Sequence, residues 1–514
     1  MTTIRDDAPS TIVGANKDKG AHGDLRAVVP ALTILWHYDL RRVGQCAPLA
    51  RGLTEVSRYT APFDSSADVV LSRNAFLLVH QSDKGIELRT AGAKTSVVVD
   101  CEPLSSPRTI SAEELQRGIV IALADQIVVC LHQLRTPVLR GPTLGLVGSS
   151  DAIESVRRQI VKVATLDLPV ILRGESGTGK ELVARAVASA SRTPTPFVAI
   201  NMGEIPPSMA AATLFGHEKG AFTGAGEAHS GIFAEADGGT LFLDEIASTP
   251  VEVQKMLLRV LETGEIRALG SRRSRKVKVR LISATDKDLD AAVGRGTFEG
   301  PLLNRIQEGY QIDLPPLRDR REDVGALFLH FLRQKLAATG ELDRLDPRSA
   351  QDRPWLDARD FARIAASPFP GNLRTLNHCA SQIVVSNRGQ SVALLDSAVE
   401  RILSESDRAP ATIPPTSRRS GQPTDAEIQQ ALRGNAYNLA AAASELGIHR
   451  STLYDRMEKI PGAVRSAGDV SDGDVLEAHA RHGGDINAMA TAMRIPPKPL
   501  KTRVDEVLRK QRRV

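Results

Sequence analysis

The spacing of apolar residues changes several times along the chain, and each change marks a different kind of structure. Between residues 32 and 132 the apolar positions fall in short runs broken by turn residues, among them FLLVHQ, IELRT and IVVCLHQ. Many short strands with frequent breaks are typical of a β-sandwich, which we predict at residues 29–136. The polar residues 1–28 show no periodicity, and we expect them to form a disordered tail.

Residues 144–315 carry the pattern of an α/β domain. The apolar run LPVILR is followed by glycines and by the amphipathic stretch KELVARAVASAS, and later apolar runs occur in GTLFLDE and VRLISAT. Continuous apolar runs are typical of parallel strands that are covered on both faces of the sheet. Residues 316–405 have helical periodicity, so we predict an all-helical region there.

The C-terminal part of the chain contains an internal repeat. Residues 406–423 are rich in Pro, Ser and Arg and have the composition of a linker. Beyond them, the units 424–462 and 463–514 contain two stretches, 424–457 and 471–504, that align without gaps, so that Thr424 corresponds to Ser471. Each of these two residues begins a helix-capping pattern. We therefore predict two three-helix units with similar cores.

Composition permits several partners and argues against two kinds of site. A chain of 514 residues is too long to fold around a single hydrophobic core, so we expect several domains. Its 66 basic and 61 acidic residues are compatible with nucleic-acid binding but do not require it. No apolar run is long enough to span a membrane and the polar N-terminus is no signal peptide, so we expect a cytoplasmic protein. The cysteines lack CxxC spacing, which argues against a zinc site or disulfide framework and predicts reduced core residues at Cys46, Cys101, Cys130 and Cys379.

The glycine-rich segment after the run LPVILR predicts a phosphate-binding loop. Its glycines allow successive backbone N–H groups to face phosphate oxygens, and the following helix adds the positive end of its dipole. Lys180 supplies a charge for the outer phosphates, whereas Glu181 replaces the Ser or Thr that usually binds magnesium in such loops. The residues predicted to bind ATP are Gly174, Glu175, Ser176, Gly177, Thr178, Gly179, Lys180 and Glu181.

Two carboxylates stand at the end of the apolar run TLFL. Asp244 is placed to enter the coordination shell of Mg²⁺, and Glu245 is placed to polarise a water molecule. Together with the phosphate-binding loop, these residues predict hydrolysis of ATP with Mg²⁺ as a cofactor.

Five motifs, in this order, make the central region similar to a known family. They are GESGTGKE, FGHEKGAFTGA, GGTLFLDE, LPPLRDRREDV and FPGNLRTL. Residues 144–400 resemble the bacterial enhancer-binding proteins, the AAA+ activators of sigma-54 RNA polymerase, and the C-terminal repeat resembles the Fis-type helix-turn-helix that usually follows. The resemblance implies an AAA+ P-loop ATPase domain at residues 144–315 with a helical lid at 316–405. It also implies a hexameric ring that binds double-stranded DNA and acts on the sigma-54 RNA polymerase holoenzyme.

The segment GAFTGA is not explained by core formation, because small residues surround its one aromatic residue, Phe222. In the resembled family this segment is a loop that rises from the ring when ATP is bound and contacts sigma-54. Glycines adopt backbone angles closed to other residues and so provide hinges, and an exposed Phe is a suitable anchor for a transient partner. The resemblance assigns the sigma-54 contact to Gly220, Ala221, Phe222, Thr223, Gly224 and Ala225.

The resemblance also assigns roles around the nucleotide. Asn201 matches the residue that holds the Walker B glutamate until the γ-phosphate is sensed. Thr285 falls at the first sensor, although Asp286 stands where the family has Asn beside it. Arg374 matches the second sensor, an arginine that reaches the nucleotide from the helical lid.

The arginines that act between subunits depart most from the family pattern. The family has two arginines, six residues apart, that reach the neighbouring subunit's ATP; Arg305 matches the second, and Glu299 replaces the first. An arginine finger typically accounts for roughly 10³–10⁵ in rate, and a carboxylate repels phosphate. Either Arg305 suffices, or a nearby residue such as Arg295 substitutes, or hydrolysis is slow. We expect a working but altered ATPase.

A basic run precedes the first-sensor strand. It contains Arg272, Arg273, Arg275, Lys276, Lys278 and Arg280. The run either faces DNA in the central pore of a ring or forms a solvated hairpin of alternating charge, and the hairpin is the favoured interpretation.

The C-terminal units carry the residues expected to contact DNA. In the first unit RSTLYDRMEKI is the predicted recognition helix, whose exposed side chains reach base edges and phosphates. The second unit either adds a DNA contact or serves as a degenerate dimerisation unit. The predicted DNA-binding residues are Arg450, Ser451, Thr452, Tyr454, Arg456, Lys498, Lys501 and Arg503.

The N-terminal sandwich resembles a forkhead-associated domain, a reader of phosphothreonine. Arg51, Ser72 and Arg73 lie where that family has its phosphate ligands, whereas its His after the Ser and its Asn-Gly loop are absent here. The resemblance implies a phosphothreonine protein as a partner of this domain.

Two functions are consistent with these motifs. The first is an ATP-driven activator that binds upstream DNA and remodels sigma-54 polymerase. The second is a DNA-binding regulator whose ATP site is a slow-hydrolysing conformational switch. The intact GAFTGA segment favours the first, and Glu299 together with Asp286 supports the second.

Overall fold

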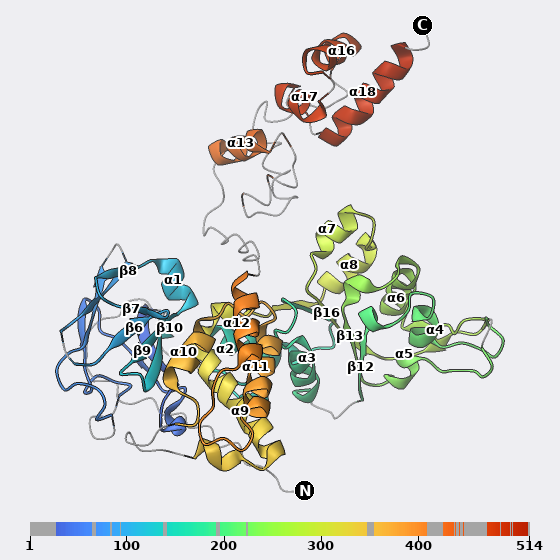
Figure 1. Ribbon diagram of the computed structural model, residues 1–514. Helices are drawn as coiled ribbons and strands as arrows, with labels where there is room; N and C mark the ends of the chain where they lie inside the picture. Colours follow the sequence, from blue (N-terminus) through green and yellow to red (C-terminus); the bar gives the residue numbers. More distant parts are fainter. Residues whose placement is uncertain are drawn as a thin grey trace. The chain divides into compact units, whose positions relative to one another are not determined.

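The structure is a computed structural model in which the chain forms two compact units, Met1–Arg408 and Ala409–Val514 (Figure 1). Nearly all of the predicted tail and linker lies outside the described residues. The structure describes residues 27–63, 68–82, 85–92, 94–136, 141–191, 196–222, 225–346, 354–408, 425–435, 437, 442, 446, 470–483, 485–493, 495 and 497–511.

The N-terminal region consists of two antiparallel sheets. Within the described residues one sheet has the strand order β2-β1-β10-β9-β6-β7 and the other β3-β4-β5-β8. Side chains from both sheets, such as Ile34, Val79 and Val129, form one buried cluster. The region is therefore built of strands, as the short apolar runs predicted. Its elements are β1 (Ala27–Trp36), η1 (Leu40–Arg42), β2 (Cys46–Pro48), β3 (Leu53–Val56), β4 (Leu77–Ser82), β5 (Gly85–Thr90), β6 (Val97–Val99), β7 (Glu102–Pro103), β8 (Arg108–Ile110), α1 (Ala112–Arg117), β9 (Ile119–Leu123) and β10 (Ile127–Thr136).

Strand β10 is buried on both faces, which explains its continuous apolar run. Ile127, Val129 and Leu131 join the cluster between the two sheets, whereas Val128 and Cys130 join a cluster formed with helices of the central region. Successive side chains of a strand point to opposite faces, so a strand covered on one face only would alternate apolar and polar residues. The continuous apolar run IVVCL therefore indicates that β10 packs against a second partner, the helices of the central region. The sandwich prediction did not include this partner.

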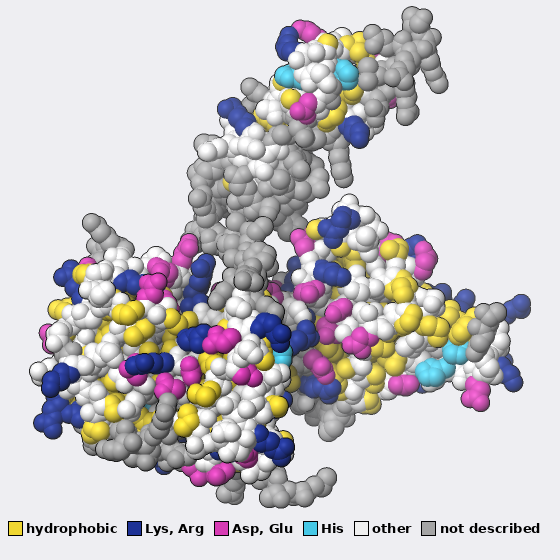
Figure 2. All heavy atoms as spheres, viewed as in Figure 1, with side chains coloured by type: hydrophobic (Ala, Val, Ile, Leu, Met, Phe, Trp, Pro, Cys, Tyr) yellow, Lys and Arg dark blue, Asp and Glu magenta, His cyan; other side chains and the backbone are white. Residues whose placement is uncertain are grey.

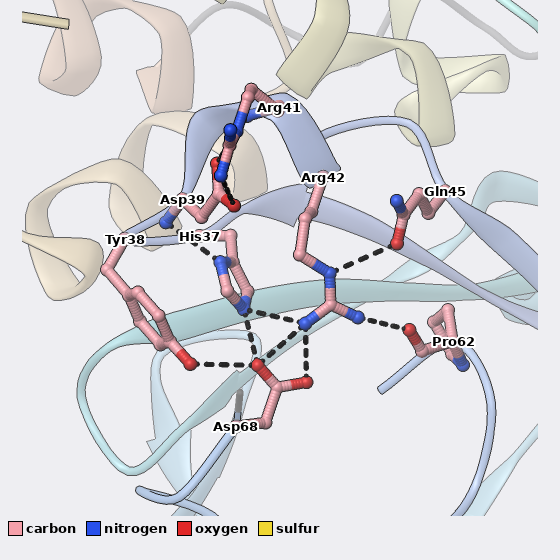
Figure 3. Close-up of polar contacts among 8 residues, drawn as sticks. All are labelled: His37, Tyr38, Asp39, Arg41, Arg42, Gln45, Pro62 and Asp68. Atoms are coloured by element: carbon pink, nitrogen blue, oxygen red, sulfur yellow. Dashed lines mark hydrogen bonds and ion pairs between the residues drawn. The ribbon is translucent and has the colours of Figure 1, made fainter. Parts of the chain in front are cut away.

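A buried polar network joins the end of β1 to the loop that precedes β4 (Figure 3). Asp68 is fully buried and accepts hydrogen bonds of 2.7–2.9 Å from His37, Tyr38 and Arg42. His37 Nδ1 accepts the backbone N–H of Asp39, so the neutral ring carries its proton on Nε2 and donates it to Asp68. Burial, reinforced by the Asp68 carboxylate, raises the pKa of the Tyr38 hydroxyl far above its usual value. The network stabilises the loop because each partner compensates the buried carboxylate.

The first part of the central region contains a parallel sheet with helices on both faces. Its strand order is β12-β13-β16-β11-β17. Ile171 of β11 packs on one face, and Val170 and Leu172 pack on the other. The α/β prediction is confirmed. The elements are α2 (Asp151–Ala164), β11 (Val170–Arg173), α3 (Lys180–Ser189), β12 (Phe197–Asn201), η2 (Met202–Glu204), α4 (Ala210–Phe215), α5 (Ile232–Glu235), β13 (Thr240–Asp244), η3 (Ile246–Ser248), α6 (Val251–Thr263), β14 (Glu265–Ile266), β15 (Arg275–Lys276), β16 (Arg280–Thr285), α7 (Leu289–Gly294), α8 (Gly300–Gln307) and β17 (Tyr310–Asp313).

A helical lid follows the sheet, as its periodicity predicted. Its core includes Phe328, Phe361 and Ile383, which are fully buried. Short 3-10 turns connect the last strand of the sheet to the first long helix of the lid. Within the described residues the lid elements are η4 (Leu317–Asp319), η5 (Arg321–Asp323), α9 (Val324–Thr339), η6 (Leu342–Leu345), α10 (Ala358–Ala366), α11 (Asn372–Ser386) and α12 (Ser397–Arg408).

The described part of the second unit is helical. Its elements are α13 (Asp425–Gly434), α16 (Asp472–Arg481), α17 (Ile486–Met493) and α18 (Pro497–Gln511). The last three enclose a small core that includes Val475, Met489 and Leu500. The hydroxyl of Ser471 accepts the backbone N–H of Asp474 at 3.2 Å, which is the cap that the repeat predicted for this unit.

None of the four cysteines forms a disulfide, and they are not all core residues. Cys130 and Cys379 are buried and Cys46 is half-buried, whereas Cys101 is exposed. Cys101 lies in the turn between β6 and β7 with a φ of +68°, so it cannot join the sheet core. Among the described residues, no helix combines the length and the apolarity needed to cross a membrane.

Candidate nucleotide-binding site

The loop between β11 and α3 is folded so tightly that its glycines are required. Gly177 and Gly179 have φ values of +77° and +99°, in the left-handed region that favours glycine. A Cβ on Gly177 would lie 2.2 Å from the carbonyl oxygen of Gly371, so no larger residue fits there. Glycine-rich turns that lead into a helix N-terminus direct their backbone N–H groups at anions. The loop therefore has the geometry that its motif predicted.

Lys180 begins α3 and lies inside the loop. Its Nζ donates to the carbonyl oxygens of Gly174 and Glu175 at 2.9 and 3.1 Å, and the residue is 9% exposed. Burial lowers the pKa of Lys180, and the nearby carboxylates of Asp244 and Asp286 oppose that shift. The ammonium group is held by neutral carbonyl oxygens, which phosphate oxygens can replace with stronger charge-assisted bonds.

The strand order brings the predicted catalytic residues to one edge of the sheet. β13 ends at Asp244 and β16 ends at Thr285, and β16 lies between β13 and β11. The carbonyl oxygen of Thr285 accepts the backbone N–H of Gly174 at 3.3 Å, which joins the predicted first sensor directly to the phosphate-binding loop. Ligands of open α/β sheets bind at the carboxyl ends of the strands, where these residues lie.

Glu245 and Asn201 both lie next to Gly203. Glu245 has φ +51° and ψ +45°, and its backbone N–H donates to Asp244 Oδ1 at 2.9 Å. A Cβ on Gly203 would lie 2.1 Å from Glu245 Oε2, so the absence of a side chain there leaves room for the carboxylate. Asn201 accepts the Gly203 N–H at 2.9 Å and donates to Glu204 at 3.1 Å rather than to Glu245.

The lid contacts the loop through the start of α11. The backbone N–H of Leu373 donates to the carbonyl oxygen of Gly177 at 3.0 Å. Arg374 Nη1 donates to Ser176 Oγ at 3.1 Å. The predicted second sensor therefore lies against the phosphate-binding loop.

Two more residues hold the loop, and spacing arguments did not identify them. Arg318 donates to both oxygens of Glu175 at 2.8 and 2.6 Å, and its guanidinium group lowers the pKa of Glu175. Asn372 donates to Glu175 at 3.2 Å and to the carbonyl oxygen of Ser176 at 3.0 Å. Glu175 and Arg318 are 143 positions apart. The one sequence signal for these residues was their place in the motifs LPPLRDRREDV and FPGNLRTL.

The GAFTGA segment belongs to a narrow arm between α4 and α5, which reaches away from the sheet in Figure 1. Two backbone hydrogen bonds of 2.9 Å, one in each direction between His217 and His229, close the base of the arm. The ring of Phe222 lies 5.0 Å from the ring of His217 and is half-buried, whereas the sequence predicted an exposed ring.

The turn at the tip of the arm requires a glycine. Gly220 has a φ of +80°, and its N–H donates to the carbonyl oxygen of Ala225 at 2.8 Å. Thr223 and Gly224 lie outside the described residues. Gly220 thus has a backbone angle that favours glycine, and the hinge motion itself stays a prediction.

Family models and related sequences agree with this geometry. Residues 146–312 match the model of the sigma-54 interaction domain, and residues 426–459 match that of bacterial regulatory proteins of the Fis family. The DNA-binding transcriptional regulator NtrC of Salmonella typhimurium is 39% identical over 338 residues, which cover 65% of this chain and 69% of that protein. The chain belongs to the sigma-54-dependent transcriptional activators. It binds DNA, acts on sigma-54 RNA polymerase and carries a nucleotide-hydrolysing P-loop domain.

Other relatives of this activator match it over a smaller share of their length. The transcriptional activator HyfR of Escherichia coli is 38% identical over 347 residues, which cover 65% of this chain and 50% of that protein. The Nif-specific regulatory protein of Rhodobacter capsulatus is 43% identical over 259 residues, which cover 49% of this chain and 43% of that protein. The matched part of the activator thus spans about half of these two proteins.

The predicted intersubunit arginine of the activator is held on α8. Arg305 pairs with Glu308 at 2.5 Å and donates to a backbone carbonyl oxygen at 3.2 Å, and its side chain is 42% exposed. Glu299 is the N-cap of α8, and its carboxylate lies 4.0 Å from Lys255 Nζ. Arg305 is therefore presented at the surface in a restrained position, and Lys255 offsets part of the negative charge of Glu299.

The basic run of the activator is partly neutralised within the first unit. Arg275 lies 3.1 Å from Asp237, and Lys278 lies 3.6 Å from Asp167. Arg280 donates to the last carbonyl oxygens of α2 at 2.9 and 3.0 Å. On the face of the first unit visible in Figure 2, basic and acidic side chains are interspersed. These pairs agree with a solvated hairpin formed by β14 and β15.

The described DNA-contact candidates differ in what they contact. Lys501 is exposed on α18. Arg503 pairs with Asp472 at 2.5 Å and donates to the carbonyl oxygen of Val470 at 3.4 Å, so it is held within its unit. Outside the described residues lie the side chains of Arg450, Ser451, Thr452, Tyr454, Arg456 and Lys498.

The structure does not bring the three predicted phosphate ligands together. The register of β3 with β4 places Arg51 beside the C-terminal end of β4, whereas Ser72 and Arg73 precede its N-terminal end. A strand of this length spans about 20 Å. Arg58 lies beside Ser72 instead: its N–H donates to the Ser72 carbonyl oxygen at 3.1 Å. Its side chain is 7% exposed, and its Nε has no hydrogen-bond partner among the described residues.

Proposed function

We propose that this activator assembles into a homo-oligomeric ring, a hexamer, that hydrolyses ATP to remodel the sigma-54 RNA polymerase holoenzyme from DNA sites upstream of promoters. The main support is the continuity between the nucleotide site and the arm. The segment that carries the arm connects β12, which ends at Asn201, with β13, which ends at Asp244. At the base of the arm Phe215 stacks on Phe233 with ring centroids 5.4 Å apart. In this proposal a shift at the end of β12 is passed along this segment to the arm that carries Phe222.

Each residue of the site has a distinct role in this proposal. Lys180 and the loop N–H groups bind the phosphates, and Arg374 holds the nucleotide from the lid. Glu245 orients and polarises the attacking water. Asn201, which donates to Glu204 in this structure, takes up Glu245 in place of Glu204 in another state of the cycle and restrains it until the γ-phosphate is sensed. Arg305 reaches the ATP of the neighbouring subunit and stabilises charge that develops in the transition state.

Mg²⁺ fits the donor set of this site. Asp244 offers a hard carboxylate ligand at the strand end, and Mg²⁺ usually combines one or two carboxylates with waters and substrate phosphates. Glu181 pairs with Arg185 at 2.7 Å, so its carboxylate is already engaged. When bound, Mg²⁺ neutralises charge on the phosphates and orients them.

Transcription from a sigma-54 promoter tests the proposal. With sigma-54 polymerase and a template that carries a selected upstream binding site, we expect open complexes with ATP and none with a non-hydrolysable analogue. The Lys180→Ala variant should give none with either nucleotide. Activation by the analogue as strong as by ATP would instead establish the alternative function, a DNA-binding regulator whose ATP site is a slow-hydrolysing switch.

The C-terminal units anchor the ring in this proposal. Residues 426–459 match the Fis family model and supply the operator contacts. The second unit adds a further DNA contact through the N-terminal end of α18, where Lys501 is exposed. A protein that acts on promoter DNA and RNA polymerase works in the bacterial cytoplasm.

A second proposed activity belongs to the N-terminal region. We infer that it is a forkhead-associated-type sandwich that binds a phosphothreonine protein through Ser72, Arg73 and Arg58. The side chain of Arg58 is buried and its Nε has no hydrogen-bond partner among the described residues, while its backbone N–H is bonded to Ser72; these two observations favour this activity. A phosphothreonine peptide should bind the full-length chain more tightly than its unphosphorylated form, and Arg58→Ala should remove that difference. Equal binding of the two peptides to the wild-type chain would disprove it.

A further inference from the structure

The N-terminal sheet and the lid share one hydrophobic core. Trp36, at the end of β1, stacks on Phe361 of α10 with ring centroids 4.6 Å apart and meets Phe328 of α9 edge-on at 6.0 Å. A Cβ on Gly325 would lie 2.1 Å from the carbonyl oxygen of Leu35, so the backbones of β1 and α9 are in direct contact. Burial of this extent in one cluster is typical of a domain interior rather than of two domains joined by a linker.

Polar contacts extend this interface to the turn η5. Arg321 donates to the carbonyl oxygen of Gly118 in the N-terminal region at 3.3 Å and to that of Ala366 in the lid at 3.2 Å. Glu322 lies 4.0 Å from the imidazole of His132, which donates its Nδ1 proton to a backbone carbonyl oxygen rather than to Glu322. Burial raises the pKa of Glu322, and the neighbouring carboxylate of Asp323 adds to that shift.

The same short segment also contacts the phosphate-binding loop. Arg318, three positions before Arg321, holds both oxygens of Glu175 at 2.6 and 2.8 Å. Asp323, two positions after Arg321, accepts hydrogen bonds from the backbone N–H groups of Ser149 and Ser150 at 2.6 and 2.9 Å, at the start of α2. Residues 318–323, which we call the coupling segment, thus contact the loop, the α/β domain and the N-terminal sheet within two turns of backbone.

From these contacts we infer that the coupling segment transmits the position of the N-terminal region to the nucleotide site. The N-terminal sheet and the lid move as one body, and Arg318 links that body to the loop through Glu175. Arg318 and Arg321 are positioning residues: neither reacts, but Arg318 holds the loop through Glu175, and Arg321 holds the coupling segment against the N-terminal region and the lid. The inference requires only that the loop binds ATP, so it can fail or succeed independently of polymerase remodelling.

A physical consequence follows for any partner of the N-terminal region. A partner that displaces the shared body changes the contact of Arg318 with Glu175 and hence the affinity for ATP. Coupling between two binding sites is reciprocal, so ATP changes the affinity for that partner by the same factor. Preorganisation of a binding loop favours affinity because less ordering is needed on binding, and loosening the coupling segment should therefore weaken ATP binding.

Two arginine variants of the full-length chain test this inference. Arg321→Met removes a contact between the lid and the N-terminal region and should weaken ATP binding about fivefold, at the lower end of usual couplings. Arg363→Ala is the matched control, because Arg363 pairs with Glu400 inside the lid at 2.6 Å. It should change ATP affinity less than about twofold. Unchanged affinity in Arg321→Met, with circular dichroism like that of the wild type, would overturn the inference.

Hydrogen exchange gives a test that does not depend on how well a variant folds. In the wild-type chain, ATP with Mg²⁺ should slow amide exchange in residues 119–131, although these residues touch no part of the nucleotide site. In Arg318→Met that effect should be lost at saturating ATP. The double variant Arg318→Met with Arg321→Met should bind ATP about as weakly as the weaker single variant, because the two act in series. No ATP effect on residues 119–131 in the wild type, or full additivity of the two substitutions, would refute the coupling.

Discussion

Replacement of Phe222 by alanine is expected to abolish promoter opening while ATP hydrolysis continues. The ring of Phe222 contacts His217 on the arm, and the arm is closed at its base by the backbone hydrogen bonds of His217 with His229. Loss of the ring therefore leaves the loop, Asp244 and Glu245 undisturbed. Aromatic anchors of an interface usually contribute about 2–4 kcal/mol, so open-complex formation should fall by roughly 30- to 1,000-fold.

Permanganate footprinting of the promoter together with a phosphate-release assay measures both sides of this prediction. Met209→Ala is a suitable control, because Met209 is an exposed apolar residue at the start of α4, outside the arm. It should support opening at the wild-type level. Normal opening by Phe222→Ala would show that the arm does not contact sigma-54 through this ring. A parallel loss of ATP turnover would show instead that the ring supports the nucleotide site.

Replacement of Arg305 by alanine should lower kcat for ATP hydrolysis by about 10³, the lower end of the usual effect of an arginine finger. ATP affinity should change little, because Lys180 and Arg374 remain in place. Loss of the pair with Glu308 does not explain such an effect, since exposed ion pairs usually contribute no more than about 1 kcal/mol to stability. Steady-state turnover and nucleotide binding, measured at a protein concentration that permits assembly, separate the two quantities.

Mixing experiments then show whether Arg305 acts between subunits. The Arg305→Ala variant keeps an intact phosphate-binding loop, and the Lys180→Ala variant keeps Arg305. In a mixed ring an intact loop can therefore face an intact Arg305 of the neighbouring subunit, so part of the lost ATP turnover should return. Arg295→Ala is the informative comparison, because Arg295 caps α7 and was the alternative finger. If Arg295→Ala and not Arg305→Ala loses turnover, the finger is Arg295. If neither variant loses ATP turnover, the ATP site works without an intersubunit arginine, which would agree with the presence of Glu299 at the first arginine position.

The parts of the site that were predictable from the sequence are those made by contiguous residues. The strand, loop and helix around Lys180 are encoded within a single stretch, because an apolar run, glycines and an amphipathic run each specify their own backbone. Asp244 stands where a buried strand leaves the sheet, and parallel strands end at a shared edge. The α/β sheet and the helical lid followed from apolar periodicity in the same way.

The contacts that were missed join residues far apart in the chain. Nothing in local spacing connects Glu175 with Arg318, and the turn after β3 moves Arg51 away from Ser72 and brings Arg58 beside it. A continuous apolar run indicates that both faces of a strand are covered, but it does not indicate which element covers the second face.

For this activator, the sequence alone determined the kind of chemistry: a phosphate-binding loop, a pair of acidic residues and a glycine-containing arm, each encoded in a few adjacent residues. Tertiary structure alone decided how the N-terminal region is attached. Trp36 packs between α9 and α10, and residues 318–323 connect that interface to the loop. The physical reason is that local backbone preferences act over a few residues. Packing partners, in contrast, depend on which distant apolar surfaces are buried together when the whole core forms.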